Sequence, residues 1–143
     1  MRIAIRTDAS NDIGSGHVMR CITLARLLKS EGNVVIFVCR PQAGDLIDFI
    51  KSQNMNVISL GILESYREPS HSADYIGWLQ TSVSVDANEF LSKIENIDVV
   101  ITDHYAIGRE WHRLVRGALS CKIIAIDDLV CEHDADLVLD QTL

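Results

Sequence analysis

Short apolar segments alternate with longer amphipathic segments along almost the whole of this 143-residue chain. The run Val34–Cys39 is unbroken by polar residues, which is typical of a strand buried on both faces. Residues 17–30 instead repeat apolar positions at three- and four-residue spacing, as an amphipathic helix does, and Gly32 supplies a stop signal. Strands joined through helices form βαβ units. The sequence therefore predicts an α/β fold, a Rossmann-like parallel sheet with helices on both faces.

The same pattern predicts the individual elements. Strands are expected over 2–6, 34–39, 56–60, 98–102, 122–126 and 137–139. Helices are expected over 17–30, 45–53, 86–96 and 108–118, with Asp86 as the cap of the third and with Trp111, Leu114, Val115 and Ala118 on one face of the fourth. Residues 61–85 read as an irregular connection with short helical turns around 72–80, and a connection of that length is often functional.

Composition narrows the class of protein. The 20 acidic and 13 basic residues give a net charge of −7, which argues against a nucleic-acid partner. No apolar run approaches the ~20 residues of a membrane span, and the first residues do not form a signal peptide. The four cysteines form no CxxC pair, which favours free thiols over disulfides or zinc. We therefore expect a cytoplasmic protein without a nucleic-acid or membrane partner.

Polar clusters follow three of the predicted strands. They are Asp8 with Ser10, Asp103 with His104 and Tyr105, and Asp127 with Asp128. For each cluster alone, turn chemistry is the better explanation, because Asp and Ser favour turns. All three fall at the carboxyl ends of strands, where open parallel sheets bind ligands, and this predicts a site. Binding of Mg²⁺ by Asp8, Asp103, Asp127 and Asp128 is a weaker alternative.

The loop Gly14-Ser15-Gly16 connects the first strand to the first helix. It is not a dinucleotide fingerprint, because Met19 stands where the third glycine would be, and it is not a P-loop. His17 opens the helix, whose dipole disfavours an imidazolium, so a neutral ring is available as a general base. We expect Asp8 to orient that ring. The alternative is a histidine that only caps or packs against its own helix.

Local charge supports an anionic ligand near the first helix. Residues 1–26 carry a net charge of +2, from Arg2, Arg6, Arg20 and Arg26 against Asp8 and Asp12. Residues 127–140 hold six acids and no Lys or Arg, which a solvated face explains equally well. His71, His112 and His133 have no partner at ligand spacing, so we expect them at the surface.

Five motifs together carry a family resemblance. They are Arg6–Ser10, Ile13–Cys21, Asp103–Tyr105 followed by Trp111, Ile126–Leu129 and Leu139–Gln141. In this order they closely resemble the PseG family of nucleotide-sugar hydrolases over the whole chain. That family cleaves UDP from UDP-2,4-diacetamido-2,4,6-trideoxy-β-L-altropyranose in the bacterial pathway to pseudaminic acid, which decorates flagellin and surface polysaccharides.

The resemblance implies more than the residues alone. Its fold is similar to that of GT-B enzymes, so residues 1–143 would form the N-terminal domain, and a C-terminal domain that binds most of the UDP would be missing after Leu143. It makes His17 the catalytic residue that activates water in an inverting, metal-independent reaction with no cofactor. The expected substrate-binding residues are Asp8, Gly14, Ser15, Gly16, Arg20, Asp103, His104, Tyr105, Asp127 and Asp128.

Three alternatives stay open from the sequence. A GT-B glycosyltransferase would pass the sugar to an acceptor instead of water. A non-catalytic half would only bind the sugar nucleotide. A Mg²⁺-dependent phosphohydrolase would use the aspartates and would lose activity in chelator.

Overall fold

The computed structural model describes residues 1–63, 65–129 and 131–141. Its six strands are all parallel and follow the order β3-β2-β1-β4-β5-β6. This is the Rossmann order, so the predicted fold class is confirmed. The strands are β1 (Arg2–Thr7), β2 (Val34–Cys39), β3 (Asn56–Ser59), β4 (Val99–Asp103), β5 (Lys122–Ile126) and β6 (Leu137–Leu139).

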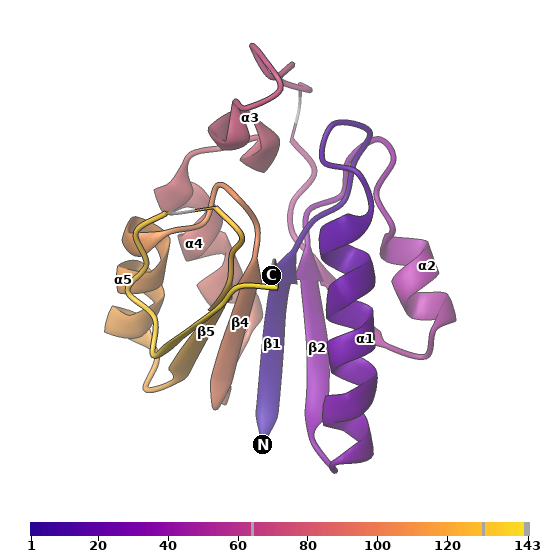
Figure 1. Cartoon of the computed structure of the whole chain (residues 1–143), viewed down its shortest axis with the longest axis vertical. Helices are drawn as coiled ribbons and strands as arrows, with labels where there is room; N and C mark the ends of the chain where they lie inside the picture. Colours follow the sequence, from indigo (N-terminus) through magenta and orange to yellow (C-terminus); the bar gives the residue numbers. More distant parts are fainter. Residues whose placement is uncertain (64, 130, 142–143) are drawn as a thin grey trace.

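Helices cover both faces of the sheet (Figure 1). They are α1 (Gly16–Ser30), α2 (Ile47–Ser52), α3 (Tyr75–Leu79), α4 (Val83–Lys93) and α5 (Arg109–Ala118). One face packs against α1 and α2, and the other packs against α4 and α5. The short helix α3 lies beyond the carboxyl ends of the strands, at the upper end of the molecule in Figure 1.

The two hydrophobic cores follow from the alternation of side chains along each strand. In β1, Ile3 and Ile5 join the core beneath α1 and α2, whereas Ala4 joins the core beneath α4 and α5. Both sides of a central strand are therefore buried. This explains why β2 reads as an unbroken apolar run.

The predicted helix over 86–96 begins earlier and has a different cap. α4 starts at Val83, and the Ser82 side chain accepts the Val85 backbone N–H at 3.2 Å. Asp86 was wrongly predicted as the cap. Its carboxylate is buried and accepts hydrogen bonds from Arg6, Arg40 and Trp111. Long-range arginines outcompete the backbone amides of its own helix for this carboxylate.

The buried face of α5 also differs from the prediction. Trp111 and Val115 are buried as expected, but Leu114 is 37% exposed and His112 is fully buried in its place. The His112 Nε2 atom lies 2.9 Å from Thr102 Oγ1 on β4. This hydrogen bond allows the imidazole to enter the core, so the prediction of a surface position for His112 was wrong.

The other element predictions agree with the structure to within a few residues. Helical structure in the 61–85 connection is confirmed as α3. All four cysteines are free, and Cys21, Cys39 and Cys121 are buried. None of the helices in the described part of the chain is long and apolar enough to cross a bilayer. The predicted domain boundary at Leu143 falls outside the described residues.

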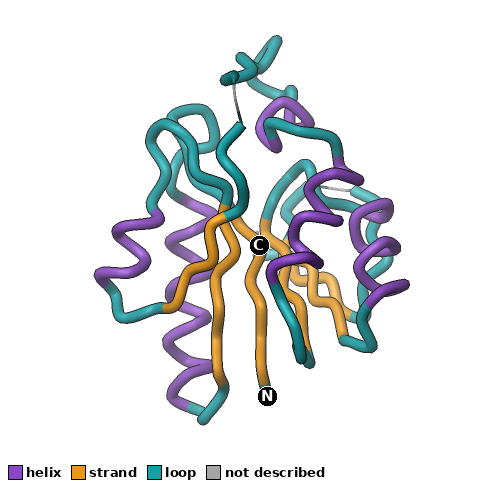
Figure 2. The backbone as a smooth tube through the Cα atoms, turned by 180° about the vertical axis from the view of Figure 1, so that it is seen from behind, coloured by secondary structure: helices purple, strands orange, loops and turns teal. Residues whose placement is uncertain are grey.

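The connection after β1 leads to β2 on one side of the sheet, and the connection after β4 leads to β5 on the other side. The chain therefore reverses its direction of travel across the sheet between β1 and β4, which makes this position the switch point. Thr7 at the end of β1 pairs in register with Asp103 at the end of β4. The loops that follow the strands gather at the same end, as the tube in Figure 2 shows from behind. This edge carries the candidate site.

Candidate functional site

The loop before α1 is a tight turn that leaves its glycines open. Gly14 has a φ of +80°, and its backbone N–H donates to Ser10 O at 2.8 Å. The Ser10 hydroxyl accepts the backbone N–H groups of Asp12 and Ile13. Gly14, Ser15 and Gly16 are all exposed. The start of α1 is therefore accessible at this edge, where the helix dipole favours an anion.

His17 and Arg20 share one carboxylate at the end of β4. His17 Nδ1 lies 2.6 Å from Asp103 Oδ1, while Arg20 Nε donates to Oδ2 at 2.5 Å and Arg20 Nη2 donates to Oδ1 at 2.6 Å. The Asp103 side chain is fully buried, whereas that of His17 is 9% exposed. The N-terminal part of α1 is thus fixed to β4, and the imidazole keeps a small exposed area at this edge.

The charge of Asp103 sets the tautomer of His17. Burial by itself would raise the pKa of Asp103, but hydrogen bonds from Arg20 and His17 outweigh burial and hold that pKa below its usual value. An ionised carboxylate only accepts hydrogen bonds, so in the neutral ring the proton is assigned to Nδ1. The Nε2 atom then carries the lone pair, which is what a general base needs.

The orienting carboxylate is Asp103, so the prediction of Asp8 in this role was wrong. Asp8 follows β1, and its Oδ1 accepts Arg6 Nη1 at 2.7 Å and the Arg40 backbone N–H at 2.8 Å. Its Oδ2 lies 3.2 Å from Nε2 of His104. Burial would raise the pKa of Asp8, but Arg6 and His104 lower it well below its usual value. Asp8 and His104 are therefore buried residues that hold together the loops after β1, β2 and β4.

Arg6 is the centre of a buried charge network rather than a ligand group. Its Nη2 donates to Asp86 Oδ2 at 2.7 Å, and Arg40 Nη2 donates to the same oxygen at 3.0 Å. Arg6 is 0% exposed. Arg2 stands at the far end of β1, and Arg26 donates to Gln53. Of the four arginines that give residues 1–26 their positive charge, Arg6 is therefore engaged in the buried network, and Arg20 is the one that contacts Asp103 and His17.

Tyr105 lies beside the imidazole. Its ring centroid is 4.5 Å from that of His17, and the two rings meet at 85°. Burial, together with the nearby Asp128 carboxylate, raises the pKa of Tyr105 to about 12. Asp128 Oδ2 also lies 3.7 Å from Arg20 Nη1. His17, Arg20, Asp103, Tyr105 and Asp128 thus form one cluster.

Two aromatic residues of α3 complete this cluster, and neither was predicted from the sequence. The Trp78 ring stacks on Tyr105 at 5.7 Å and 23°, and the Tyr75 ring lies 5.0 Å from that of Tyr105. The available signal was a Tyr and a Trp three residues apart in a long polar connection. Nothing local indicated which strand end they would cover.

Asp127 makes a separate centre. Its Oδ1 accepts the Leu129 backbone N–H at 2.8 Å, and its Oδ2 lies 2.7 Å from His133 Nε2. The side chain of His133 is only 6% exposed, so the prediction of a surface His133 was wrong as well. Its ring lies 5.3 Å from that of His112. Burial, helped by His133, lowers the pKa of His112 to about 4.

The aspartates do not assemble a metal site within the described residues. No group of three His, Cys, Asp or Glu side chains there is arranged to hold an ion. The reason is visible at Asp8 and Asp103, whose oxygens are engaged by arginine and histidine side chains. The Mg²⁺ alternative therefore lacks its ligand set in this part of the chain.

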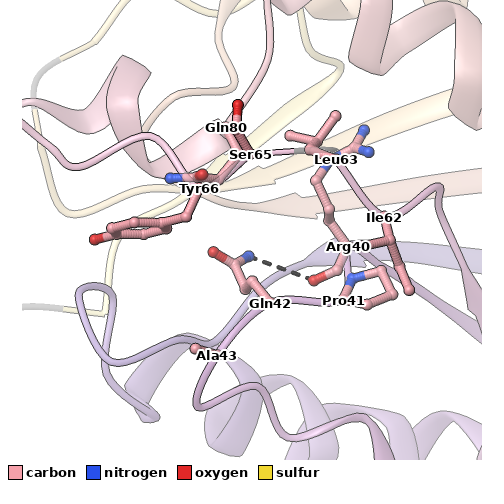
Figure 3. Close-up of a pocket in the computed structure, with 9 residues that line it drawn as sticks. All are labelled: Arg40, Pro41, Gln42, Ala43, Ile62, Leu63, Ser65, Tyr66 and Gln80. Carbon is pink, nitrogen blue, oxygen red and sulfur yellow. Dashed lines mark hydrogen bonds between the residues drawn. The ribbon is translucent and has the colours of Figure 1, made fainter.

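Several hollows lie along the same edge, and two of them matter for the site. The smaller of these two, of about 140 Å³, sits between the loop after β2 and Ile62, Leu63, Ser65 and Tyr66 (Figure 3). Pro41, Ile62 and Tyr66 give it an apolar lining, and Gln42 donates to Arg40 O across its floor. The larger, of about 400 Å³, is lined by Trp78 and the loop residues Asn11 and Asp12.

Comparison with known proteins agrees with the resemblance in the motifs. No family model matches the chain. The chain is similar to the UDP-2,4-diacetamido-2,4,6-trideoxy-beta-L-altropyranose hydrolase of Campylobacter jejuni, with 28% identity over 139 residues. The match covers 97% of this chain and 41% of the relative. The chain thus spans about two fifths of the length of the relative that it matches.

Proposed function

We propose that this chain is the half of a UDP-sugar hydrolase that holds the catalytic base. The proposed reaction releases UDP from UDP-2,4-diacetamido-2,4,6-trideoxy-β-L-altropyranose, as a step in pseudaminic acid biosynthesis. The observation that carries the proposal is His17 at the switch-point edge, held by Asp103 with Nε2 free of that contact. The name of the similar hydrolase supplies the substrate.

In the proposed mechanism, His17 Nε2 takes a proton from a water molecule while the water oxygen attacks the anomeric carbon. The bond from that carbon to the UDP oxygen breaks, and UDP leaves with the electron pair. UDP is a good leaving group, so no acid is required. A single base on the face opposite the leaving group gives inversion. The Asp103 carboxylate stabilises the imidazolium that forms.

The other site residues have proposed roles that follow from their exposure. Gly14, Ser15 and Gly16 present open backbone at the start of α1 towards the sugar and diphosphate. Arg20, Tyr105 and Asp128 line the edge around the imidazole. Asp8, His104 and Asp127 are buried, so we assign them to holding the loops that carry the exposed groups.

We further propose that the UDP moiety is bound mainly by a second, C-terminal domain in a GT-B-type arrangement. The support is that the match covers 41% of the relative's length. The four free cysteines support a cytoplasmic setting. Without the second domain the substrate loses orientation that is worth ~7–11 kcal/mol towards the barrier. The 143-residue chain is therefore expected to fold but not to turn over substrate.

The test is an assay of UDP release by the two-domain protein, with the anomeric form of the product followed by NMR. Free sugar with inverted configuration supports the proposal. A conjugate of the sugar with an acceptor would identify a transferase instead. A turnover rate of the 143-residue chain that equals that of the two-domain protein would overturn the division of labour between the domains.

A further inference from the structure

We propose that Trp78, stacked on Tyr105, forms an aromatic wall that binds the apolar face of the sugar and selects 6-deoxy, N-acetylated hexoses. The proposal rests on the proposed function for its substrate class. It adds a specificity-determining residue that lies outside the motifs of the sequence analysis. The term "aromatic wall" refers below to Tyr75, Trp78 and Tyr105.

The wall is continuous with the catalytic histidine. Tyr105 touches the His17 ring edge-on at 4.5 Å, and Trp78 stacks on Tyr105 at an interplanar angle of 23°. Tyr75 braces both, with centroids 4.7 Å from Trp78 and 5.0 Å from Tyr105. All three rings are only partly buried. The wall therefore runs without a break from the imidazole to Trp78.

The wall also borders a space of suitable size. Trp78 lines the hollow of about 400 Å³, together with Asn11, Asp12 and Pro69. Ligand pockets for small molecules typically measure ~300–1,000 Å³ and combine apolar walls with a few polar groups. The polar groups of its lining are supplied by Asn11, Asp12, Glu68, His71 and Ser72.

The helix that carries Trp78 is fastened in place by its own polar side chains. Asp74 accepts the backbone N–H groups of Ser70 and Gly77, and Gln80 bonds the backbone N–H and carbonyl of Arg67 at 2.8 and 2.7 Å. A Cβ on Gly77 would lie 2.7 Å from Asp74 Oδ2, so this packing needs glycine. Leu79 is fully buried and anchors the helix. These contacts fix the position of α3, and with it the position of the Trp78 side chain.

The chemistry of the proposed sugar matches an aromatic surface. A 2,4-diacetamido-2,4,6-trideoxy hexose carries three methyl groups and lacks the hydroxyl at C6. Its C–H bonds and methyl groups can lie against ring faces at no cost in lost hydrogen bonds. A 6-hydroxyl placed against the same rings would lose its water without gaining a partner, which is unfavourable. The wall therefore discriminates at C6.

The first test reads binding without activity, by NMR of the ¹⁵N-labelled 143-residue chain. The indole N–H signals of Trp78 and Trp111 are assigned with Trp78→Phe, and the free 2,4-diacetamido-2,4,6-trideoxy sugar is titrated in. We expect the Trp78 signal to shift and the buried Trp111 signal to stay. Galactose, which keeps its 6-hydroxyl and has no acetamido group, should shift neither. An unmoved Trp78 signal with the deoxy sugar at millimolar concentration overturns the proposal.

The second test is kinetic and uses the two-domain protein. Trp78→Ala should raise KM for the deoxy substrate by about 2- to 12-fold with little change in kcat, the usual effect of losing one aromatic contact. It should also reduce the preference over a UDP-linked 2-acetamido hexose with a 6-hydroxyl. Trp78→Phe keeps a ring and should retain most of the preference. The matched control is Ile76→Ala, which alters an exposed residue of the same helix.

The outcomes separate the two proposals. If Trp78→Ala changes neither KM nor the preference, or lowers kcat alone together with the melting temperature, the role of Trp78 is structural and the inference is wrong. If the unaltered protein releases UDP from neither nucleotide, the proposed function is wrong. The indole titration then still decides whether the aromatic wall binds a deoxy sugar.

Discussion

Asp8 and Asp103 stand at the ends of two neighbouring strands, and each is paired with one arginine and one histidine. Asp8 binds Arg6 and faces His104, and Asp103 binds Arg20 and His17. The difference lies in what surrounds them. The side chain of His104 is 1% exposed, while that of His17 is 9% exposed and borders Tyr105.

The same residue types, one Asp with one Arg and one His, can thus form either a buried structural contact, as at Asp8, or a candidate catalytic group, as at Asp103. At Asp8 the partners come from β1 and from the residue that follows β4, so this carboxylate joins a strand to a loop. At Asp103 both partners come from the N-terminal part of α1, so this carboxylate orients a ring that keeps a small exposed area. The following predictions test this division, from the largest expected effect to the smallest.

The two histidines should respond in opposite ways to the same substitution. His17→Asn should slow UDP release by the two-domain protein by ~10²–10⁴, the usual effect of a positioned base, with the melting temperature nearly unchanged. His104→Asn should lower the melting temperature instead, because it removes a buried partner of Asp8. Near wild-type turnover in His17→Asn would remove that residue from the mechanism.

Asp8→Asn should destabilise the fold. Burial alone would lower the pKa of Arg6, but Asp8 and Asp86 raise it well above its usual value. When Asp8 is neutralised, Arg6 keeps its contact with Asp86 and its charge, because arginine stays protonated in proteins. Weakening a buried ion pair on one side costs roughly 3–5 kcal/mol in the free energy of unfolding. Urea unfolding of the 143-residue chain measures this. The control Asp48→Asn, on the exposed side of α2, should change it by less than about 1 kcal/mol.

Asp103→Asn should act on the rate more than on the fold. An amide can still contact His17 but no longer fixes its tautomer or stabilises the imidazolium. Loss of such an orienting partner typically costs roughly 10- to 100-fold in activity. The rate is measured at a temperature where circular dichroism shows both proteins folded. Equal rate losses in Asp8→Asn and Asp103→Asn would erase the distinction between the two centres.

The free energy of unfolding, measured as a function of pH, distinguishes the contributions of Asp8 and Asp103 from the contribution of His112. Its folded pKa of about 4 lies below the unfolded value of about 6.5, so the unfolded chain binds the proton first as the pH falls. Its contribution is complete above about pH 6.5, decreases towards about pH 4, and amounts to a loss of about 2 kcal/mol at pH 5. Asp8 and Asp103 have lowered pKa values, so their contribution is present above about pH 4 and is lost in more acidic solution.

Urea unfolding at several pH values checks this assignment. His112→Gln keeps a polar group near Thr102 but does not titrate, so it should flatten the curve between pH 6.5 and 4. An unchanged slope in that variant would assign the loss to another group.

The smallest expected effect is that of a chelator. EDTA should leave the rate of the two-domain protein unchanged, because the oxygens of Asp8 and Asp103 are already bound by protein side chains. The control is addition of Mg²⁺ alone. Full loss of activity in EDTA that Mg²⁺ restores would favour a metal-dependent phosphohydrolase.

Much of the fold was predictable because its signals are local. Apolar runs and helical spacing repeat over a few residues, and they predicted the strands and the long helices. The position of the candidate site was predictable for a general reason, since the carboxyl ends of parallel strands share one edge. The errors concern polar residues whose partners no local pattern indicates, namely Asp8, Asp86, His112 and His133.

The sequence by itself determined the alternation of elements, and with it the parallel sheet and the edge where His17, Asp103 and Tyr105 meet. Only the tertiary structure decided which carboxylate serves which partner. His17 and Asp103 are 86 positions apart, and Arg6 and Asp86 are 80 apart. Periodicity identifies a buried face but not the partner across it. Which carboxylate pairs with which arginine or histidine depends on the distances between elements. Those distances set how much of the cost of burying each charge is offset by an opposite charge nearby.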